Sequence, residues 1–198
     1  GEAQLTGHGV SYCATCDGSF FRGKTVMVVG GGNTAAADAI YLSRLAEHVI
    51  LVHRRDKLRA TPVYHEQLAK LENVSFMWST EVRALRGEEG KLVSAQVEHL
   101  GDGALETVPV DGVFVAVGTQ PNTEFLAGAL PLDAGGYIVA SETGETSIPG
   151  VFAAGDVRAK ALRQWSRRCP MVQSVRSRLQ TMSQSDKILR FDNGPALV

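Results

Sequence analysis

Cysteine is scarce in this chain, and long apolar segments are missing from it. Three cysteines among 198 residues exclude the dense disulfide framework of small secreted domains. No apolar run approaches the length of a membrane span, and the first residues lack the basic-then-apolar profile of a signal peptide. A net charge of −1 gives no reason to expect nucleic acid or a membrane surface as a partner. We therefore expect a cytoplasmic protein.

Runs rich in β-branched residues alternate with segments of helical spacing from residue 24 onward. Buried parallel strands are expected at 25–29, 48–52, 74–78 and 112–117, and helices at 33–45 and 62–71. An antiparallel meander is expected at 82–85, 92–100 and 106–110. This pattern predicts an α/β fold, a doubly wound Rossmann-like domain with a small antiparallel meander. Residues 1–23 are glycine-rich, and we expect them to be irregular.

The sequence changes character twice after this domain, which we place at 1–118. Residues 119–164 begin a different unit, with strand-like segments at 137–139 and 150–156, and are too few to fold as a domain of their own. Residues 165–198 are rich in arginine, serine and glutamine and lack a consistent apolar face. Such a composition is typical of a solvated or disordered extension.

A glycine-rich loop separates the first predicted strand from the first predicted helix. It matches the pattern G-x-G-x-x-A with Gly30, Gly31, Gly32, Asn33, Thr34 and Ala35. Gly30 permits the tight turn, Gly32 lets a pyrophosphate approach the backbone, and Ala35 allows close packing of helix on strand. The helix N-terminus adds amide donors for phosphate. The loop therefore predicts a dinucleotide site; a purely structural tight turn is the alternative.

Basic residues follow the second predicted strand, where an NAD site places an acidic residue. His53, Arg54 and Arg55 stand there, and Arg59 follows. A carboxylate at this point would repel the 2′-phosphate of NADPH, whereas guanidinium groups bind it through charge-assisted hydrogen bonds. We therefore expect NADPH rather than NADH. A solvated basic turn is the alternative.

Cys13 and Cys16 form a Cys-Ala-Thr-Cys motif. In a cytosolic protein such a motif indicates a redox-active pair, half of a zinc site or a structural pair. Zinc needs four ligands, and His8 is the one further candidate nearby in the sequence, so we favour the redox pair. Asp17 could protonate a leaving thiolate as a general acid. It could equally serve as a turn or capping residue.

The motifs described above, together with 113–118 and 149–157, occur in the order and spacing of bacterial-type thioredoxin reductases. The chain resembles this family over about residues 1–164. The family consists of homodimers in which electrons pass from NADPH to FAD, then to a cysteine pair, and finally to the disulfide of thioredoxin. The resemblance implies catalytic roles for Cys13, Cys16 and Asp17. Cys16 would face the flavin, Cys13 would attack thioredoxin, and Asp17 would be the acid.

The resemblance also implies which residues bind each cofactor. The 2′-phosphate of NADPH would be held by three arginines, Arg54, Arg55 and Arg59. His53 would lie beside the adenine ribose, and the nucleotide would also be lined by Val117 and Gly118. FAD would be contacted by three residues, Asp156, Arg163 and Gln164. One departure is Ala37, which stands where the family usually has Glu, although Asp38 keeps the second acid.

Two further expectations concern segments on either side of these motifs. The family's FAD domain begins with its own glycine loop, and this chain carries one such loop, the NADPH one. Residues 119–164 would then be the C-terminal remnant of an FAD domain whose first segment is absent. After Gln164 the family continues with a further helix, whose sequence this chain does not show. If one nucleotide is inserted before the Trp165 codon, the possible codons that follow are read in a different frame. In that frame they can encode the residues of the family's helix at almost every position. We therefore expect 165–198 to be an out-of-frame tail and Cys169 to have no redox role.

The expected function is thus that of a thioredoxin-disulfide reductase, in a chain that would be inactive alone. Two alternatives stay open at this point. One is a stand-alone NADP(H)-binding dithiol module. The other is a flavin disulfide reductase that acts on a different partner, because no motif encodes the surface that binds the disulfide substrate.

Overall fold

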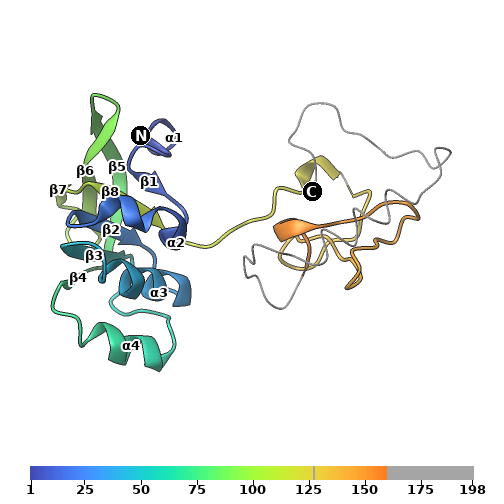
Figure 1. Cartoon of the computed structure of the whole chain (residues 1–198), viewed down its shortest axis with the longest axis horizontal. Coiled ribbons are helices and arrows are strands. Elements are labelled where there is room, and N and C mark those ends of the chain that lie inside the picture. The colour runs from blue at the N-terminus through green and yellow to red at the C-terminus, as the bar shows by residue number, and fades with distance from the viewer. Residues whose placement is uncertain (127, 160–198) are drawn as a thin grey trace. The chain divides into compact units, whose positions relative to one another are not determined.

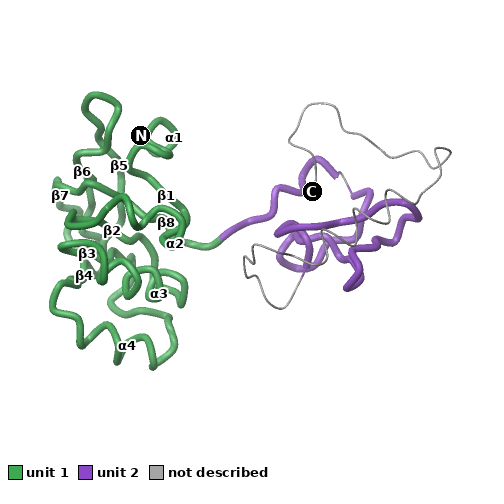
Figure 2. The backbone as a smooth tube through the Cα atoms, in the orientation of Figure 1, with its two compact units in different colours: residues 1–118 green, residues 119–198 purple. Residues whose placement is uncertain are grey.

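The structure is a computed structural model that describes residues 1–126 and 128–159. The chain forms two compact units, residues 1–118 and 119–198, which Figure 2 draws in different colours. The expectations for Arg163, Gln164, Cys169 and the tail 165–198 lie outside the described residues. Within the described part, no helix is both long and apolar enough to cross a membrane.

Five parallel strands form the central sheet of residues 1–118 (Figure 1). In sheet order they are β1 (Val10–Ser11), β8 (Gly112–Val115), β2 (Thr25–Val29), β3 (His48–His53) and β4 (Val74–Trp78). Every neighbouring pair is parallel, so the carboxyl ends of all five strands lie along one edge of the sheet. Strands buried on both faces are continuous apolar runs, which is why β2 and β3 lack alternation.

Two helices, α3 (Asn33–Leu42) and α4 (Pro62–Leu68), pack with one face of this sheet in a single apolar cluster. The sheet contributes every second residue of its strands to that cluster, among them Val26, Val28, Val49, Leu51 and Phe114. The helix α3 contributes fully buried alanines, Ala35, Ala36 and Ala39. Because these side chains are small, the helix that follows the glycine loop can approach the strands closely.

An antiparallel meander covers the opposite face of the sheet. Its strands are β5 (Thr80–Glu88), β6 (Lys91–His99) and β7 (Leu105–Pro109). The intervening residues of the central strands point towards it, and Met27, Ile50 and Val113 form a second apolar cluster with Ala95 and Val97. Successive strand residues point to opposite faces. The central strands are therefore divided between two cores, one under the helices and one under the meander.

The predicted fold class is confirmed, since the chain combines a parallel sheet, helices and a small antiparallel sheet. Helices α3 and α4 end earlier than predicted, because the backbone after Leu42 and Leu68 closes into turns. The expectation that residues 1–23 are irregular was wrong. They contain four short elements, α1 (Glu2–Leu5), β1, α2 (Ala14–Asp17) and the 3-10 helix η1 (Gly18–Phe21). Elements of two to four residues are too short to show a periodic pattern.

The described part of the second unit contains no regular strand, contrary to the strands expected at 137–139 and 150–156. Isolated bridges join Leu132 to Ile138, Ile138 to Arg158, and Glu145 to Phe152. Two short 3-10 helices accompany them, η2 (Glu124–Leu126) and η3 (Gly155–Val157). A small apolar cluster of Leu126, Leu130, Ile138 and Ala153 gives these residues a core of their own.

Asp38 on α3 is half-buried, and the effect of this burial on the stability of the fold can be tested. Burial raises the pKa of its carboxyl group from 3.8 to about 6. The folded protein therefore binds a proton more tightly than the unfolded chain does, so stability falls as the pH rises from about 4 to about 6 and stays low above that. Asp38→Asn removes the charge. We expect the variant to be more stable than the original chain at pH 8, by roughly 1 kcal/mol after allowance for solvent screening.

Urea titrations of both proteins at pH 8 and pH 4.5 measure this effect. The advantage of Asp38→Asn should shrink at pH 4.5, where the original carboxyl group is largely protonated in the folded state. A variant that is less stable than the original at both pH values would show instead that the carboxylate makes a stabilising interaction.

Candidate functional site

Three segments follow strands at the same edge of the parallel sheet. They are the glycine loop (30–35), the basic turn that carries Arg54, Arg55 and Arg59, and the cysteine turn that carries Cys13 and Cys16. β2 ends at Val29 and leads into the glycine loop, and β3 ends at His53 and leads into the basic turn. β1 ends at Ser11, two residues before Cys13, and β8 lies between β1 and β2. In open parallel sheets, ligands bind outside this carboxyl edge.

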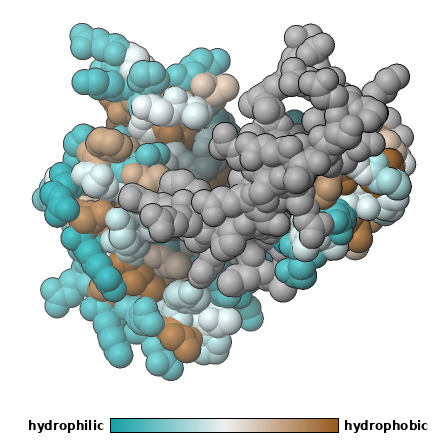
Figure 3. Space-filling model, turned by 45° about the vertical axis from the view of Figure 1, so that its right-hand side comes forward, coloured by the Kyte–Doolittle hydropathy of each residue, from teal (hydrophilic) through white to brown (hydrophobic). Residues whose placement is uncertain are grey.

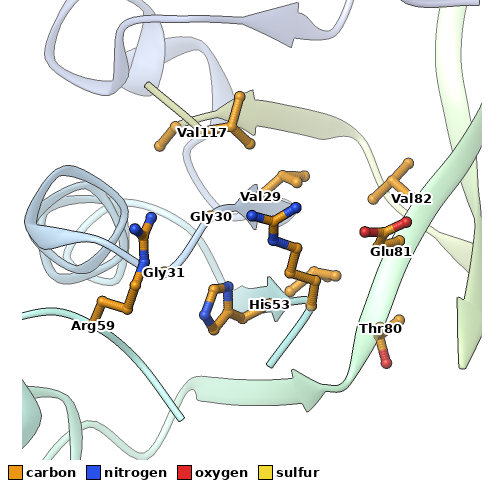
Figure 4. A pocket seen from close by; sticks show the side chains of 12 residues that line it. Val29, Gly30, Gly31, His53, Arg59, Thr80, Glu81, Val82 and Val117 are labelled. Carbon is orange, nitrogen blue, oxygen red and sulfur yellow. The ribbon is translucent and has the colours of Figure 1, made fainter. Parts of the chain in front are cut away.

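A cavity of about 320 Å³ opens beside the glycine loop (Figure 4). Its walls come from four segments that are distant in sequence: the end of β2, the end of β3 with its basic turn, the start of β5 and the residues after β8. They contribute mainly Gly30, Gly31, His53, Arg54, Arg59, Thr80, Glu81, Val82, Ala116 and Val117. In Figure 4, His53 and Arg59 lie by the glycine loop, and Thr80, Glu81 and Val82 face them from β5.

Two glycines of the loop are required by close contacts. Gly30 has a φ of +148°, and a Cβ atom there would overlap the carbonyl oxygen of Ala116. At Gly31 a Cβ atom would overlap the imidazole ring of His53, which lies directly against the loop. Gly32 differs, since its Cβ would project into open space. Its backbone is therefore open to a ligand, as a pyrophosphate contact needs.

His53 is buried in the cavity wall, and its Nε2 atom has no hydrogen-bond partner within the described part of the chain. Burial lowers the pKa of His53, and the positive charges of Arg59, Arg55 and Arg54 lower it further. The ring is thus held neutral beside three cations. Because buried polar atoms are nearly always satisfied, an unpaired imidazole nitrogen here indicates a place for a polar ligand.

The other predicted nucleotide residues occupy different positions around this cavity. Arg59 is tied to the loop, because its backbone N–H donates to the carbonyl of Gly31 at 2.7 Å. Arg55 is absent from the cavity wall. Asn33 accepts a hydrogen bond from the backbone N–H of Thr61 at 2.9 Å and so joins the loop to the start of α4. Thr34 is exposed on the first turn of α3.

The remaining predicted cofactor residues lie further along the chain. Val117 lines the cavity and is 65% exposed. Gly118 follows it with a φ of +112°. Asp156 lies in η3 of the second unit, and the two other expected FAD contacts belong to the residues that are not described.

Cys13 and Cys16 are joined by a disulfide, with their Cα atoms 5.3 Å apart. Cys13 is the N-cap of α2, and its Sγ accepts a hydrogen bond from the backbone N–H of Cys16 at 3.2 Å. Cys16 is exposed and Cys13 is half-buried. Both features suit thiol–disulfide exchange, which needs an accessible sulfur and a stabilised leaving thiolate. Among the described residues, no cluster of three or more His, Cys, Asp or Glu side chains could hold a metal ion.

Ser11 is a residue of this site that the sequence reasoning missed. It is buried at the end of β1, where its hydroxyl oxygen accepts a hydrogen bond from the backbone N–H of Cys13 at 3.1 Å. The same hydroxyl group donates to Oδ2 of Asp17 at 2.7 Å. The one signal in the sequence is a serine two residues before the first cysteine, a spacing that favours a serine turn.

The surface around the cysteine turn carries exposed aromatic side chains. Tyr12 is 56% exposed and Phe20 is 71% exposed. In the view of Figure 3, the apolar residues visible in the described part of the chain are interspersed with polar ones. Exposed aromatic residues beside an accessible disulfide are typical of a surface that binds another protein.

Fold and site together define a dinucleotide-binding domain that carries an exchangeable disulfide at the same sheet edge. The family model described as "Pyridine nucleotide-disulphide oxidoreductase" matches residues 1–176. The chain belongs to this family.

Its relatives include a thioredoxin reductase from Listeria monocytogenes serovar 1/2a, which is 47% identical over 164 residues, covering 83% of this chain and 51% of that protein. The crystal structure of thioredoxin reductase from Streptococcus pyogenes MGAS5005 is 39% identical with a TM-score of 0.74, covering 88% of this chain and 55% of that one. A ferredoxin-flavin thioredoxin reductase from Clostridium acetobutylicum is 30% identical with a TM-score of 0.50, covering 83% and 51%. The chain spans about half the length of the curated relatives it matches.

The contact between His53 and the glycine loop can be tested with two neighbouring substitutions. Gly31→Ala adds a methyl group where the imidazole ring lies, and such overpacking costs about 1–3 kcal/mol. Gly32→Ala adds the same group in open space and should cost less than about 1 kcal/mol, the loss of a good N-cap residue. Thermal and urea unfolding measure both. Equal destabilisation by the two substitutions would contradict the contact.

Proposed function

We propose that this chain is the NADPH-binding and disulfide-exchanging part of a thioredoxin reductase. The observation that carries the proposal is the presence of a cavity beside the glycine loop and of an accessible disulfide, Cys13–Cys16, at one edge of a single parallel sheet. The thioredoxin reductases among its relatives support the reaction, and thioredoxin is the proposed disulfide substrate. Cys16 would receive electrons, Cys13 would attack the substrate disulfide, and Asp17 would supply a proton.

The cavity residues fit NADPH. The glycine loop, residues 30–35, would hold the pyrophosphate, because Gly32 leaves its backbone open and the N-terminus of α3 offers amide donors. The unpaired Nε2 of His53 would meet the adenine ribose. Arg54 and Arg59, which line the cavity, would contact the 2′-phosphate directly, and Arg55, which does not line it, would add its positive charge from the same turn. Val117 and Gly118 would line the nucleotide. When bound, NADPH supplies a hydride, which carries the two electrons that one disulfide needs.

FAD is proposed for the complete protein, and no step is assigned to it on this chain. Of its three expected contacts, Asp156 is the one that the structure describes, and a flavin site cannot be built from that residue alone. A homodimer and a cytoplasmic location are proposed on the same family grounds. Residues 119–164 are proposed to belong to the FAD domain, and 165–198 to be an out-of-frame tail.

A second candidate function is a flavin disulfide reductase that draws electrons from ferredoxin. The likeness to the Clostridium acetobutylicum enzyme favours it, since that protein is a ferredoxin-flavin thioredoxin reductase. The glycine loop with open backbone at Gly32, together with the basic wall formed by Arg54 and Arg59, favours NADPH instead. Binding of NADPH separates the two candidates directly.

The cofactor preference gives a prediction at the basic turn. An arginine–phosphate contact contributes about 1.5–3 kcal/mol, so replacing both Arg54 and Arg59 by Ala should weaken NADPH binding by roughly 100-fold or more. NADH lacks the 2′-phosphate, so its affinity should change little. Calorimetric titration or NADPH fluorescence gives the dissociation constants.

Arg55→Ala is the matched control, because Arg55 carries the same charge in the same turn but does not line the cavity. We expect Arg55→Ala to weaken NADPH binding by less than either other single substitution. Equal losses for NADPH and NADH in the Arg54/Arg59 variant would contradict phosphate recognition at this turn.

Disulfide exchange with thioredoxin can be tested without a flavin. The chain is reduced with dithiothreitol, freed of the reductant, and mixed with oxidised thioredoxin. We expect one thioredoxin disulfide to be reduced per chain, because the dithiol carries two electrons. Alkylation of new thiols followed by mass spectrometry measures the transfer. Cys13→Ser should abolish it, since Cys16 alone cannot complete the exchange; transfer that survives this substitution would reject the assignment.

A further inference from the structure

Ser11 links the proposed proton donor to the cysteine turn through three short contacts. Its Oγ lies 2.7 Å from Oδ2 of Asp17, 3.1 Å from the backbone nitrogen of Cys13 and 3.4 Å from the carbonyl oxygen of Cys13. Ser11 is 5% exposed, and Asp17 is half-buried. Ser11 belongs to β1, whose pairing with Phe114 of β8 fixes its position at the sheet edge.

The hydroxyl group of Ser11 can form a hydrogen bond with Asp17 whether the Asp17 carboxyl group is ionised or protonated. It has one hydrogen to donate and two lone pairs that accept, and one lone pair takes the backbone N–H of Cys13. While Asp17 is ionised, the hydroxyl donates its hydrogen to the carboxylate, the nearer acceptor. When Asp17 is protonated, the acid donates to Ser11 Oγ, and the hydroxyl hydrogen turns to the Cys13 carbonyl. Asp17 therefore keeps its partner when its proton is gained or lost.

We propose that Ser11 is a positioning residue for disulfide exchange, which holds Asp17 at a fixed place beside the cysteine turn throughout the proton transfer. This inference rests on the proposed function, in which Asp17 supplies the proton. Without Ser11, the carboxyl group would lose its hydrogen-bond link to the turn that carries Cys13. General acid catalysis depends on such a fixed geometry.

The reaction with dithiothreitol shows where the proton is needed. One thiolate of the reductant attacks the exposed Sγ of Cys16, forming a mixed disulfide and breaking the Cys13–Cys16 bond. The electron pair stays on Sγ of Cys13, which takes the proton of Asp17. The second thiol of dithiothreitol then displaces Cys16 and closes the oxidised ring. Cys16 and Asp17 are reprotonated from solvent, so two electrons and two protons reach the cysteine pair.

Two isosteric substitutions separate the hydroxyl group from the shape of the side chain. Ser11→Thr keeps the hydroxyl, whereas Ser11→Val has the same shape and lacks it. We measure the rate at which dithiothreitol reduces the disulfide in the 198-residue chain at one fixed pH. The rate for Ser11→Val should be about 10-fold below that for Ser11→Thr, a part of the roughly 100-fold or more that a positioned acid contributes.

A double-mutant cycle tests whether Ser11 acts through Asp17. Asp17→Asn should slow exchange, and adding Ser11→Val should then have no further effect. Equal slowing by Ser11→Val with and without Asp17→Asn would overturn the proposal, as would equal rates for the Thr and Val variants. Unfolding curves show which variants fold, and Ser11→Ala replaces Ser11→Val if the latter does not.

The test also separates this inference from the proposed function. Dithiothreitol replaces NADPH as the electron donor, and the reduction of the disulfide is followed without thioredoxin, so a failure of the chain to use either of them does not affect the measured rates. If Asp17→Asn exchanges as fast as the original chain, the proton-donor role of Asp17 is rejected, and the role of Ser11 falls with it.

Discussion

The nucleotide cavity depends on the contact between the His53 ring and the backbone of Gly31. This contact joins the end of β3 to the glycine loop after β2, and the hydrogen bond from Arg59 to Gly31 adds the basic turn to the same point. The imidazole is buried, and no group in residues 1–126 and 128–159 is hydrogen-bonded to its Nε2, which costs free energy in the absence of a ligand. The glycine loop, the basic turn and the His53 ring therefore form one unit. Its unpaired Nε2 atom would be the group that binds a nucleotide.

Positive and negative charges lie on different walls of the cavity. Arg54 and Arg59 lie on one wall beside the neutral ring of His53, and Glu81 lies on the wall formed by β5. Glu81 is paired with Arg83 at 3.0 Å, so its carboxylate is held near this wall. A phosphate group is attracted to the basic wall and repelled by the acidic one. For the NADPH proposed above, this polarity would favour an orientation with the 2′-phosphate towards the arginines.

Part of this structure was predictable because the relevant signals are local. β2 and β4 match their predicted bounds, since each is a short run rich in β-branched, aromatic and other apolar residues between turns, and the glycine loop and cysteine pair are contiguous motifs. The wall residues Thr80 and Glu81 could not be assigned from the sequence, because they reach the cavity only when the meander packs on the sheet. Ser11 was missed for a related reason: its role comes from β1, a two-residue strand that exists through its pairing with β8.

The order of the strands also bears on how electrons could move between the two sites. The cysteine turn follows β1 and the glycine loop follows β2, with β8 between them. Neighbouring strands are about 4.8 Å apart, so the two strand ends are separated by roughly 10 Å. A hydride passes between atoms about 3–3.5 Å apart. Direct transfer from a nucleotide in the cavity to the disulfide therefore requires either a large displacement or a carrier that meets both sites in turn. The flavin proposed for the complete protein would be such a carrier, and with it the nucleotide and the disulfide would not need to approach each other.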